Sequence, residues 1–404
     1  MNILVVSQYF FPEQFRINDI VTELVRRGHF VSVLTGLPNY PTGEIYDGYK
    51  NCSNEVDSYN GAVIYRCKLR PRYQGTMNLI LNYLSFVIQA KKMLKRLKGH
   101  FDLIYVYGVS PVTQALPAIK FKKTHKKPII YYVCDLWPEC VRGEQNGHRQ
   151  IGIRNPIYVF TKILTKYIYK RVDLILNKCD EFEKYNIEIC KVKKEKQATL
   201  FEHAETIYLN VQEKQEDNKI VDFFFLGNIG RAQNCNLIIE ATKNLKDTNN
   251  YKIHFVGDGS ELKSVKDLVD MYELANKVEF HGKVSVADVI KYYNIADVCL
   301  LLLSHRTETG LTLPAKLTSY MAACRPIIAS ADGATKTIIE DANCGWVCPA
   351  DNVDELTKLM QKVIDNPESL NGLGQNGREY FLEHFTLEKH VDELEKDIEK
   401  MVNI

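Results

Sequence analysis

The sequence predicts an α/β protein made of two doubly wound domains, each a parallel sheet with helices on both faces. The chain has 404 residues, which is more than one hydrophobic core usually organises. Short apolar runs alternate with segments of helical spacing in both halves of the chain. A highly charged, weakly periodic stretch at residues 191–219 separates the two series. We therefore expect two similar lobes that face each other across a cleft at the carboxyl ends of their strands.

The first half opens with a strand–helix–strand unit. Residues 3–7 are a buried apolar strand, residues 17–27 have helical spacing and stop at Gly28, and residues 30–35 form the next strand. Further strands are expected at residues 63–65, 103–107, 129–133 and 174–176. Residues 1–11 are apolar, but they lack a basic start and a small-residue cleavage site. We expect a first strand there and not a signal peptide.

A second series of the same kind follows the charged stretch. Strands are expected at residues 221–226, 252–256, 278–280, 298–303, 326–329 and 346–348, and helices at 261–272, 286–293, 353–364 and 387–401. The predicted domains are residues 1–195 and 219–375, with a linker at 196–218. Residues 376–404 are predicted to form C-terminal helices, the last of which packs back toward the first domain.

Composition limits the class of protein. The hydrophobic fraction is 45% and the charged fraction 25%, as in ordinary globular proteins. No apolar run approaches the roughly 20 residues of a membrane span. The eleven cysteines contain no CxxC pair, which favours free thiols in a reducing compartment. Cys344 and Cys348 leave a zinc site as the alternative.

Positive charge is concentrated in one part of the first domain. Residues 62–134 contain fourteen lysines and arginines and a single acid, Asp102. This asymmetry favours an anionic partner, namely membrane phosphate, nucleic acid or a phosphorylated substrate. Within this region the apolar residues 79–87 are followed at once by a basic cluster of Lys91, Lys92, Lys95, Arg96 and Lys98. We interpret this as an interfacial helix on an anionic leaflet, the alternative being a core helix with a solvated basic end. No nucleic-acid-binding motif accompanies the charge, so no nucleic acid partner is expected.

Residues 308–329 predict a phosphate site. They read as a polar loop, a helix that starts after Pro314, and a buried strand. Thr309, Gly310, Leu311 and Thr312 belong to that loop. Gly310, Thr312 and the free amides of the helix would form an electropositive pocket, and Lys316 adds a full charge. The alternative is an ordinary crossover with a solvated lysine.

A second glycine-rich loop points the same way. A buried strand runs into Gly227, Asn228, Ile229 and Gly230, with Arg231 expected near the start of the next helix. Two glycines let backbone amides approach an anion closely. The pattern is not GxGxxG, and no acidic residue follows where a ribose would need one, which argues against a nicotinamide dehydrogenase. Asp258, between two glycines, is expected to be a turn residue.

These segments in this order resemble the retaining glycosyltransferases of family 4, which have the GT-B fold of two Rossmann-like domains. The resemblance rests on FFFLGNIGRAQNCNLIIEA, IHFVGDGSEL, VEFHGKV and YYNIADVCLLLL in the second half. VVSQYFFPE, RRGHFVSVLTGLPNYPTG and CDLWPE in the first half are similar to the branch that builds bacterial capsule, O-antigen and exopolysaccharide. Within that branch the chain resembles the WbuB-like group, described as N-acetyl-fucosaminyl or N-acetylhexosaminyl transferases.

The resemblance implies a set of binding residues. The nucleotide sugar would bind the second domain, with Gly227 to Gly230 facing the diphosphate and main-chain atoms of Val284 pairing with the base. Arg231 is the cation beside that loop, because Asn228 and Gln233 stand where many members carry arginine and lysine. Leu311 and Ser319 stand where most members carry two glutamates, and Glu308 would substitute only if the loop shifts. Lys316, in a Pro–Ala–Lys triplet that matches the branch, is the main binding candidate.

The implied chemistry needs a stabilised leaving group and a place for the acceptor's proton. Negative charge grows on the leaving diphosphate, and amides and cations stabilise it by about 3 kcal/mol per well-placed group. No DxD-like carboxylate pair is present, so neither a metal nor another cofactor is expected. Candidate acid–base residues are Asp135, Glu13 and, more weakly, Glu139. Asp135 alternatively caps the turn that follows it. His29 and His203 are expected to be structural or surface residues.

The sequence therefore predicts a hexosyltransferase-type enzyme that uses a nucleotide sugar, with UDP as the expected nucleotide. The expected acceptor is an undecaprenyl-diphosphate-linked saccharide, and the expected location is the cytoplasm, in peripheral contact with the inner face of the cell membrane. Two alternatives remain open. One is a UDP-sugar 2-epimerase of the same fold, and the other is a non-catalytic donor-binding or scaffold subunit, suggested by Leu311 and Ser319.

Overall fold

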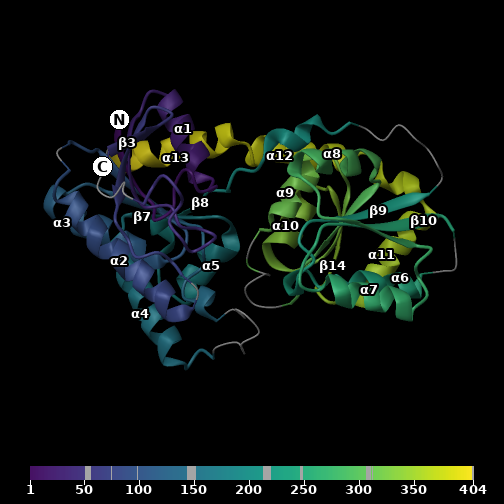
Figure 1. Cartoon of the computed structure of the whole chain (residues 1–404). Helices are drawn as coiled ribbons and strands as arrows, with labels where there is room; N and C mark the ends of the chain where they lie inside the picture. Colours follow the sequence, from purple (N-terminus) through teal and green to yellow (C-terminus); the bar gives the residue numbers. More distant parts are fainter. Residues whose placement is uncertain are drawn as a thin grey trace. The chain divides into compact units, whose positions relative to one another are not determined.

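The chain folds into two compact units. The computed structural model describes residues 1–50, 56–73, 75–97, 99–142, 152–212, 220–245, 249–305, 311 and 313–402. The first unit comprises Met1–Glu202 and Leu387–Ile404, and the second comprises His203–Thr386 (Figure 1). Each unit is a twisted sheet with helices packed on its faces, as the alternating sequence pattern predicts.

The first unit contains an eight-stranded sheet in the order β3-β4-β2-β1-β5-β6-β7-β8. All neighbouring strands pair in parallel except β3 and β4, which form an antiparallel hairpin. The strands are β1 (Asn2–Val6), β2 (Phe30–Gly36), β3 (Val56–Tyr59), β4 (Ala62–Cys67), β5 (Leu103–Gly108), β6 (Ile129–Val133), β7 (Leu174–Asn177) and β8 (Gln197–Thr199). The helices are α1 (Ile17–Arg26), α2 (Thr76–Leu94), α3 (Ala115–His125), α4 (Pro156–Tyr169), α5 (Asp180–Glu188) and α13 (Leu387–Val402).

The central strands of this sheet are covered on both faces. Every residue of β5, β6 and β7 is buried, which explains why the sequence shows continuous apolar runs there and not a polar–apolar alternation. One core cluster joins β1, β2 and β5 with α1 and with Val391, Leu394 and Ile398 of α13. The burial of the sheet on both sides leaves its carboxyl ends as the accessible edge for polar loops.

The last helix completes the first unit although it follows the second unit in sequence. Arg27 at the end of α1 donates to Asp392 at 2.7 Å and to Glu395 at 2.6 Å, both on α13. His29 lies 2.7 Å from Glu395. These contacts, together with the shared core, hold α13 against α1, as Figure 1 shows.

The second unit contains a fully parallel six-stranded sheet in the order β11-β10-β9-β12-β13-β14. Its strands are β9 (Val221–Leu226), β10 (Tyr251–Val256), β11 (Val278–Gly282), β12 (Val298–Leu302), β13 (Ile327–Ser330) and β14 (Gly345–Cys348). Its helices are α6 (Asn236–Asn244), α7 (Leu262–Met271), α8 (Val286–Ile295), α9 (Ala315–Ala322), α10 (Gly333–Asp341), α11 (Val353–Asp365) and α12 (Leu373–His384). One core cluster packs α6, α7 and α11 on one face of β9 and β10.

The boundary between the units differs from the one expected. Residues 197–199 of the predicted linker form β8, because they pair in parallel with β7 at the edge of the first sheet. The first unit therefore extends to Glu202. The predicted C-terminal segment is also divided: α12 begins at Leu373 and belongs to the second unit, whereas α13 belongs to the first. Strong charge made the edge strand resemble a linker.

Among the described residues, no helix has the combination of length and hydropathy that a membrane crossing requires.

Candidate functional site

Three glycines lie at the carboxyl ends of neighbouring strands of the second sheet. Gly227 follows β9 and Gly257 follows β10, whereas Gly282 ends β11. The amide of Gly227 donates to Val256 O at 2.8 Å, and that of Gly257 donates to Gly282 O at 2.8 Å. Both Gly227 (φ 126°) and Gly257 (φ 148°) occupy backbone conformations that other residues rarely adopt. A Cβ on Gly257 would lie 1.9 Å from Gly227 O, so only glycine allows the two turns to touch.

Lys316 lies over the Gly227 turn. It comes from the first turn of α9, and its Cε would lie 2.6 Å from a Cβ placed on Gly227. Its ammonium donates to the carbonyl of Asn228 at 3.3 Å and stands 4.2 Å from the centre of the Phe225 ring. The structure therefore brings together the two segments, Gly227–Gly230 and the start of α9, that the sequence singled out separately.

The positive charge of Lys316 destabilises the folded protein. Burial lowers the pKa of its ammonium to about 8. The described residues include the Asn228 carbonyl, the Phe225 ring and the Cys235 thiol among the neighbours of this ammonium, and none of these carries a full negative charge at neutral pH. A poorly solvated cation beside exposed turns is suited to an anionic ligand.

The other residues of the Gly227–Gly230 loop take less direct parts. Asn228 Nδ2 lies 3.5 Å from Gln233 Oε1, and Gly230 lies close enough to Asn228 that a Cβ there would meet Nδ2 at 2.6 Å. Arg231 lies near the start of a helical segment, as predicted, but not within the first turn of α6. Arg231 begins a short 3-10 turn, residues Arg231–Gln233, and α6 begins only at Asn236. Arg231 Nε lies 3.4 Å from Glu261 Oε1, so this cation is shared with a carboxylate.

The remaining predicted donor residues surround the same edge of the sheet. Val284 lies in the loop between β11 and α8, two residues after Gly282. Leu311 lies in the segment that leads to α9, and Ser304 at the end of β12 donates its amide to Ala232 O at 2.9 Å. Ser319 is buried in α9, where its hydroxyl donates to Ala315 O at 2.9 Å. The predicted residues Glu308, Thr309, Gly310 and Thr312 lie outside the described residues.

Glu13 is buried at the carboxyl end of β1 in the first unit. Its Oε1 accepts from the amides of Asn39 and Tyr40, both at 2.8 Å, and its Oε2 accepts from the amide of Phe10 at 3.3 Å. Burial raises the pKa of Glu13 to about 7, although these three amides act in the opposite direction. Glu13 therefore joins two loops and also titrates in the range suited to proton transfer.

Two further carboxylates bind neighbouring loops. Asp135 Oδ2 accepts from the amide of Ser110 at 2.6 Å. The expected capping of its own following turn is thus replaced by a link to the adjacent β5 loop. Glu139 is buried and accepts from the hydroxyls of Tyr158 at 2.9 Å and Tyr185 at 2.7 Å, and from Arg142 at 2.9 Å. Glu139 is committed to joining α4 and α5.

The aspartate, histidines and cysteines that the sequence also singled out lie as follows. Asp258 accepts from the amide of Gly259 at 2.7 Å, as a turn residue does. His29 is structural through Glu395, and His203 is buried. Cys344 and Cys348 are buried free thiols, and neither belongs to a group of three metal-ligating side chains in the described residues.

The basic segment of the first unit forms one long helix with two different sides. Inside, Phe86, Val87 and Ala90 of α2 are buried. Outside, α2 exposes an apolar row of Met77, Ile80, Leu84 and Ile88. Lys92, Lys95 and Arg96 are exposed at its end and Lys91 is partly so. Lys98 lies outside the described residues. The helix therefore has a core face and an exposed apolar face, and its contact with an anionic leaflet stays a prediction.

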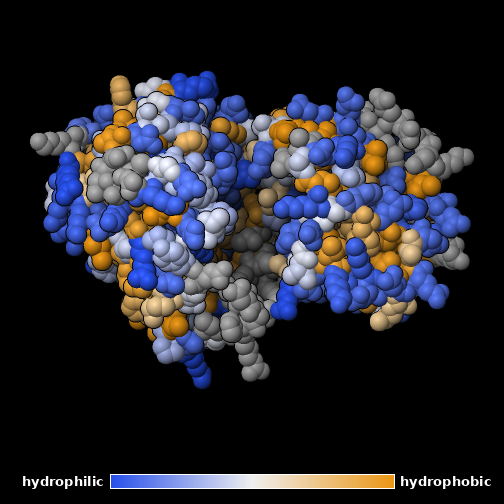
Figure 2. Space-filling view, in the orientation of Figure 1, coloured by the Kyte–Doolittle hydropathy of each residue, from blue (hydrophilic) through white to orange (hydrophobic). Residues whose placement is uncertain are grey.

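Helix α4 adds a second exposed apolar face that the sequence reasoning missed. Ile157, Phe160 and Ile163 are 55%, 65% and 63% exposed. Both α2 and α4 contact α3 and the short turn Val112–Gln114. Apolar side chains gather over this part of the first unit (Figure 2). The sequence does carry a signal for this face. In PIYVFTKILTKYIY, apolar residues cover more of the helix surface than a single core-facing stripe requires.

A cavity of about 580 Å³ opens elsewhere in the first unit, at the carboxyl ends of α3 and α4. It is lined by the cations Lys122, Lys123, Lys126, Lys170, Arg171 and Lys196. Lys122 pairs with Asp173 at 2.5 Å, and Lys196 donates to Tyr169 O at 2.7 Å. Cations at helix carboxyl ends offset the helix dipoles, which accounts for this cluster without a ligand.

Comparison with known proteins gives two family matches. The profile described as "Glycosyl transferases group 1" matches residues 206–380, and that described as "Glycosyltransferase Family 4" matches residues 15–197. The two matches are consecutive and fall on the second and first units respectively.

Individual relatives are distant. An uncharacterized glycosyltransferase of Methanocaldococcus jannaschii is 25% identical over 61% of this chain and 63% of its own length. The probable glycosyltransferase WbjE of Pseudomonas aeruginosa is 29% identical over 41% of this chain and 42% of its own. N-acetyl-alpha-D-glucosaminyl L-malate synthase of Bacillus anthracis is 24% identical over 45% of each chain. The chain thus spans under two thirds of the length of these relatives.

Solved structures are similar along almost the whole chain. Sucrose-phosphate synthase of Thermosynechococcus elongatus has a TM-score of 0.73 at 15% identity, over 99% of this chain and 98% of its own. HepE of Anabaena, solved in complex with UDP, has a TM-score of 0.70 at 11% identity, over 99% of both chains. At this level of identity the similarity establishes the fold.

Proposed function

Since the chain belongs to the GT-B glycosyltransferases of family 4, we propose that it transfers a sugar from UDP to a lipid-linked saccharide, with retention of configuration. The proposed sugar is of the N-acetylhexosamine type, and the proposed setting is bacterial capsule, O-antigen or exopolysaccharide synthesis. The observation that carries the donor half of this proposal is the position of Lys316 over the Gly227 turn, which itself touches the Gly257 turn.

A diphosphate suits this arrangement for two reasons. The glycine turns have no side chain that would keep an anion from the backbone, and the neighbours of the Lys316 ammonium named above carry no full negative charge. A UDP ligand would supply that charge and raise the pKa of Lys316 again. HepE was solved in complex with UDP, and the B. anthracis relative is named for an N-acetyl-glucosaminyl group. Both support, for this chain, the proposed donor class.

Catalysis in this proposal depends on the leaving group. As the bond from sugar to diphosphate breaks, negative charge grows on the phosphate oxygen, and a cation held in a poorly solvated place stabilises it. One such group contributes on the order of 3 kcal/mol, or about a hundredfold in rate. Lys316 is the proposed source, with the amides of the adjoining turns.

The acceptor hydroxyl must lose a proton in the same reaction. Glu13 is the better candidate for this step than Asp135, because burial raises its pKa to about 7, near the pH at which such transfer is most effective. Glu139 is not proposed, since it forms an ion pair with Arg142 and joins α4 to α5 through two tyrosines, whereas among the described residues Glu13 accepts only from backbone amides. Glu308 keeps its sequence-based candidacy and lies outside the described residues.

We also propose that the first unit rests on an anionic leaflet through α2 and α4. Their exposed apolar rows supply contact with the acyl boundary, and the cations at the end of α2 supply attraction to lipid phosphate. Each cation near such a surface contributes about 1 kcal/mol. A lipid-linked acceptor would be reached from this position.

Changing Lys91, Lys92, Lys95 and Arg96 together to glutamine should reduce sedimentation with phosphatidylglycerol vesicles by about tenfold or more. The matched control changes four exposed lysines of the second unit, Lys266, Lys291, Lys336 and Lys358, to glutamine. Equal binding by both quadruple variants would reject the proposed leaflet contact.

The proposed reaction is tested with a panel of labelled nucleotide sugars, each incubated with and without lipid-linked acceptors extracted from membranes. Transfer of label to the lipid fraction from one UDP-sugar supports the proposal. Conversion of UDP-N-acetylglucosamine to its epimer without acceptor would instead identify an epimerase. UDP binding with no transfer across the full panel would identify a non-catalytic donor-binding subunit.

A further inference from the structure

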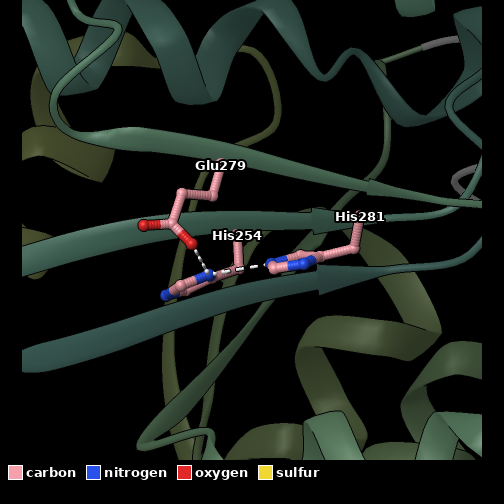
Figure 3. Close-up of side chains that lie close together, drawn as sticks. All are labelled: His254, Glu279 and His281. Atoms are coloured by element: carbon pink, nitrogen blue, oxygen red, sulfur yellow. Dashed lines mark hydrogen bonds and ion pairs between the residues drawn. The ribbon is translucent and has the colours of Figure 1, made fainter.

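Two histidines and a glutamate meet on the second sheet, on the two strands that lead into Gly257 and Gly282. His254 lies on β10, and Glu279 and His281 lie on β11. The pairing register sets His254 opposite Glu279, and His281 is the extra residue where the register shifts two positions later; the three side chains lie close together (Figure 3). Their nearest ligating atoms all lie within 4.8 Å of one another.

Hydrogen bonding determines which ring nitrogen of His254 faces His281 and Glu279. His254 Nε2 lies 3.1 Å from Asp222 Oδ1 on β9. A carboxylate only accepts, so Nε2 carries a proton, and in the neutral imidazole Nδ1 then presents its lone pair. That lone pair faces His281 Nε2 at 3.0 Å and Glu279 Oε2 at 3.6 Å. A carboxylate that orients a histidine in this way is the usual outer support of a metal-bound imidazole.

The rings are also held in position by packing. His254 stacks on Phe224 with ring centres 4.3 Å apart and planes 11° apart. His281 packs against Tyr292, with ring centres 4.9 Å apart. His254 is buried, whereas Glu279 is 46% exposed, so the group is accessible to an ion from solvent on one side. The imidazoles are therefore oriented before any ion binds.

We propose that His254 Nδ1, His281 Nε2 and Glu279 Oε2 form a binding site for a divalent transition metal, with Zn²⁺ as the best-matched ion. Two imidazoles and one carboxylate are ligands that zinc takes in sites with an open fourth position. Zinc–nitrogen bonds of about 2.0–2.1 Å in tetrahedral geometry separate two ligand atoms by roughly 3.3 Å. The observed separations of 3.0 and 3.6 Å lie on either side of that value.

The local charge allows a cation. Asp222 and Glu279 contribute two negative charges, and Lys252, which donates to Glu279 Oε1 at 3.1 Å, contributes one positive charge. Without an ion, His281 Nε2 donates its proton to His254 Nδ1. Metal binding requires only that this proton move to the other nitrogen of His281, and no net proton is lost. Mg²⁺ is a poor match, because it prefers an all-oxygen shell.

A bound ion would join β10 to the edge strand β11 just before Gly257 and Gly282. It would stabilise the folded second unit, because the three ligands come together only when these strands pair. Its role is thus to fix the edge of the sheet, and it stands apart from the diphosphate chemistry proposed above.

The test uses untagged full-length protein, freed of metal with chelator, and titrated with Zn²⁺ or Co²⁺. We expect one equivalent to bind, a visible Co²⁺ spectrum of a four-coordinate nitrogen–oxygen site, and a higher melting temperature with Zn²⁺. His281→Gln and Glu279→Gln should each weaken binding by at least about tenfold, and Asp222→Asn by about 10- to 100-fold. His100→Gln is the control, since His100 also pairs with a carboxylate, Asp102 at 3.2 Å, without a second histidine in that pair.

Each outcome decides the proposal. Failure to bind one equivalent would overturn it, as would equal affinity in Glu279→Gln and wild type. A Co²⁺–thiolate charge-transfer band would assign the ion to cysteine instead. If His281→Gln fails to fold, Glu279→Gln still decides, because that side chain is largely exposed. Mg²⁺ in place of Zn²⁺ should leave the melting temperature unchanged.

Discussion

Changing Lys316 to methionine removes the ammonium beside the glycine turns while keeping an unbranched stem next to Phe225. Burial lowers the pKa of this ammonium from 10.5 to about 8. Since a tenfold change in proton affinity corresponds to about 1.36 kcal/mol, this half-buried charge destabilises the folded second unit by at most about 3 kcal/mol at neutral pH. K316M removes this destabilisation. It also removes the hydrogen bond to the Asn228 carbonyl, which stabilises the wild type by about 1 kcal/mol. We expect K316M to raise the free energy of unfolding by at most about 2 kcal/mol.

The pH dependence gives the sign of this effect. The folded pKa lies below the unfolded one, so the unfolded chain binds the extra proton between pH 8 and 10.5. Wild-type stability should therefore rise through that interval, and the advantage of K316M should be full below pH 8 and disappear by about pH 10.5.

Binding should change in the opposite direction. Loss of one charge-assisted contact should weaken UDP binding by about tenfold or more. Wild-type affinity for UDP should fall as pH rises above 8, whereas the affinity of K316M should lack this component. We therefore expect K316M to be more stable than wild type and to bind UDP less tightly, because binding-site residues are often unfavourable for stability.

Stability is followed by urea unfolding with Trp346 fluorescence in a Trp137→Phe background, because the chain has two tryptophans and Trp346 lies in the second unit. UDP affinity is measured by titration calorimetry. Lys358→Met is the control, since Lys358 is exposed on α11 and pairs with Glu355 at 2.6 Å. Unchanged UDP affinity in K316M, or a loss of stability, would refute the role assigned to the buried charge.

Individual contacts lead to three further predictions. Gly257→Ala should destabilise the second unit by about 3 kcal/mol or more and abolish UDP binding, because its Cβ would strike Gly227 O; normal calorimetric titration would contradict this. Glu13 has a folded pKa of about 7, above the unfolded value of 4.5, so it favours the folded state below pH 4.5 and this contribution is lost as pH rises through 7. Between pH 5 and 8, the free energy of unfolding of Glu13→Gln, measured in urea, should therefore fall less steeply than that of wild type. Parallel curves would show that Glu13 does not make this contribution. Phe160→Ser with Ile163→Ser should reduce vesicle binding without lowering the melting temperature, since both side chains are exposed; a marked loss of melting temperature would show that they belong to a packed contact.

The arrangement of strands and helices followed closely from the sequence, because buried parallel strands leave continuous apolar runs. The strands at β5, β6, β9 and β12 were expected within about one residue of their observed bounds. The edge strand β8 was missed, because QAT is partly exposed and lies in a charged stretch. The hairpin strand β3 was missed for a similar reason, since most of its residues are exposed.

The candidate site was only partly predictable. The glycines and Lys316 were identified from chemistry and local pattern, and the fold explains why they meet. The contact between Gly257 and Gly227 depends on how two neighbouring strands end, which no local pattern encodes. The pairing of Glu139 with Tyr158 and Tyr185 depends on helices far apart in sequence. The histidine pair had a detectable signal, since His254 and His281 each stand shortly before the glycine that ends a strand.

The central claim, that the second unit binds a nucleoside diphosphate at its glycine turns, is tested most directly by hydrogen–deuterium exchange with and without UDP. We predict that UDP slows exchange in residues 227–233, 257–262 and 283–285 and in the first turn of α9. Unchanged exchange in these segments, or protection confined to the lysine-lined cavity around Lys122 and Lys126, would contradict the claim.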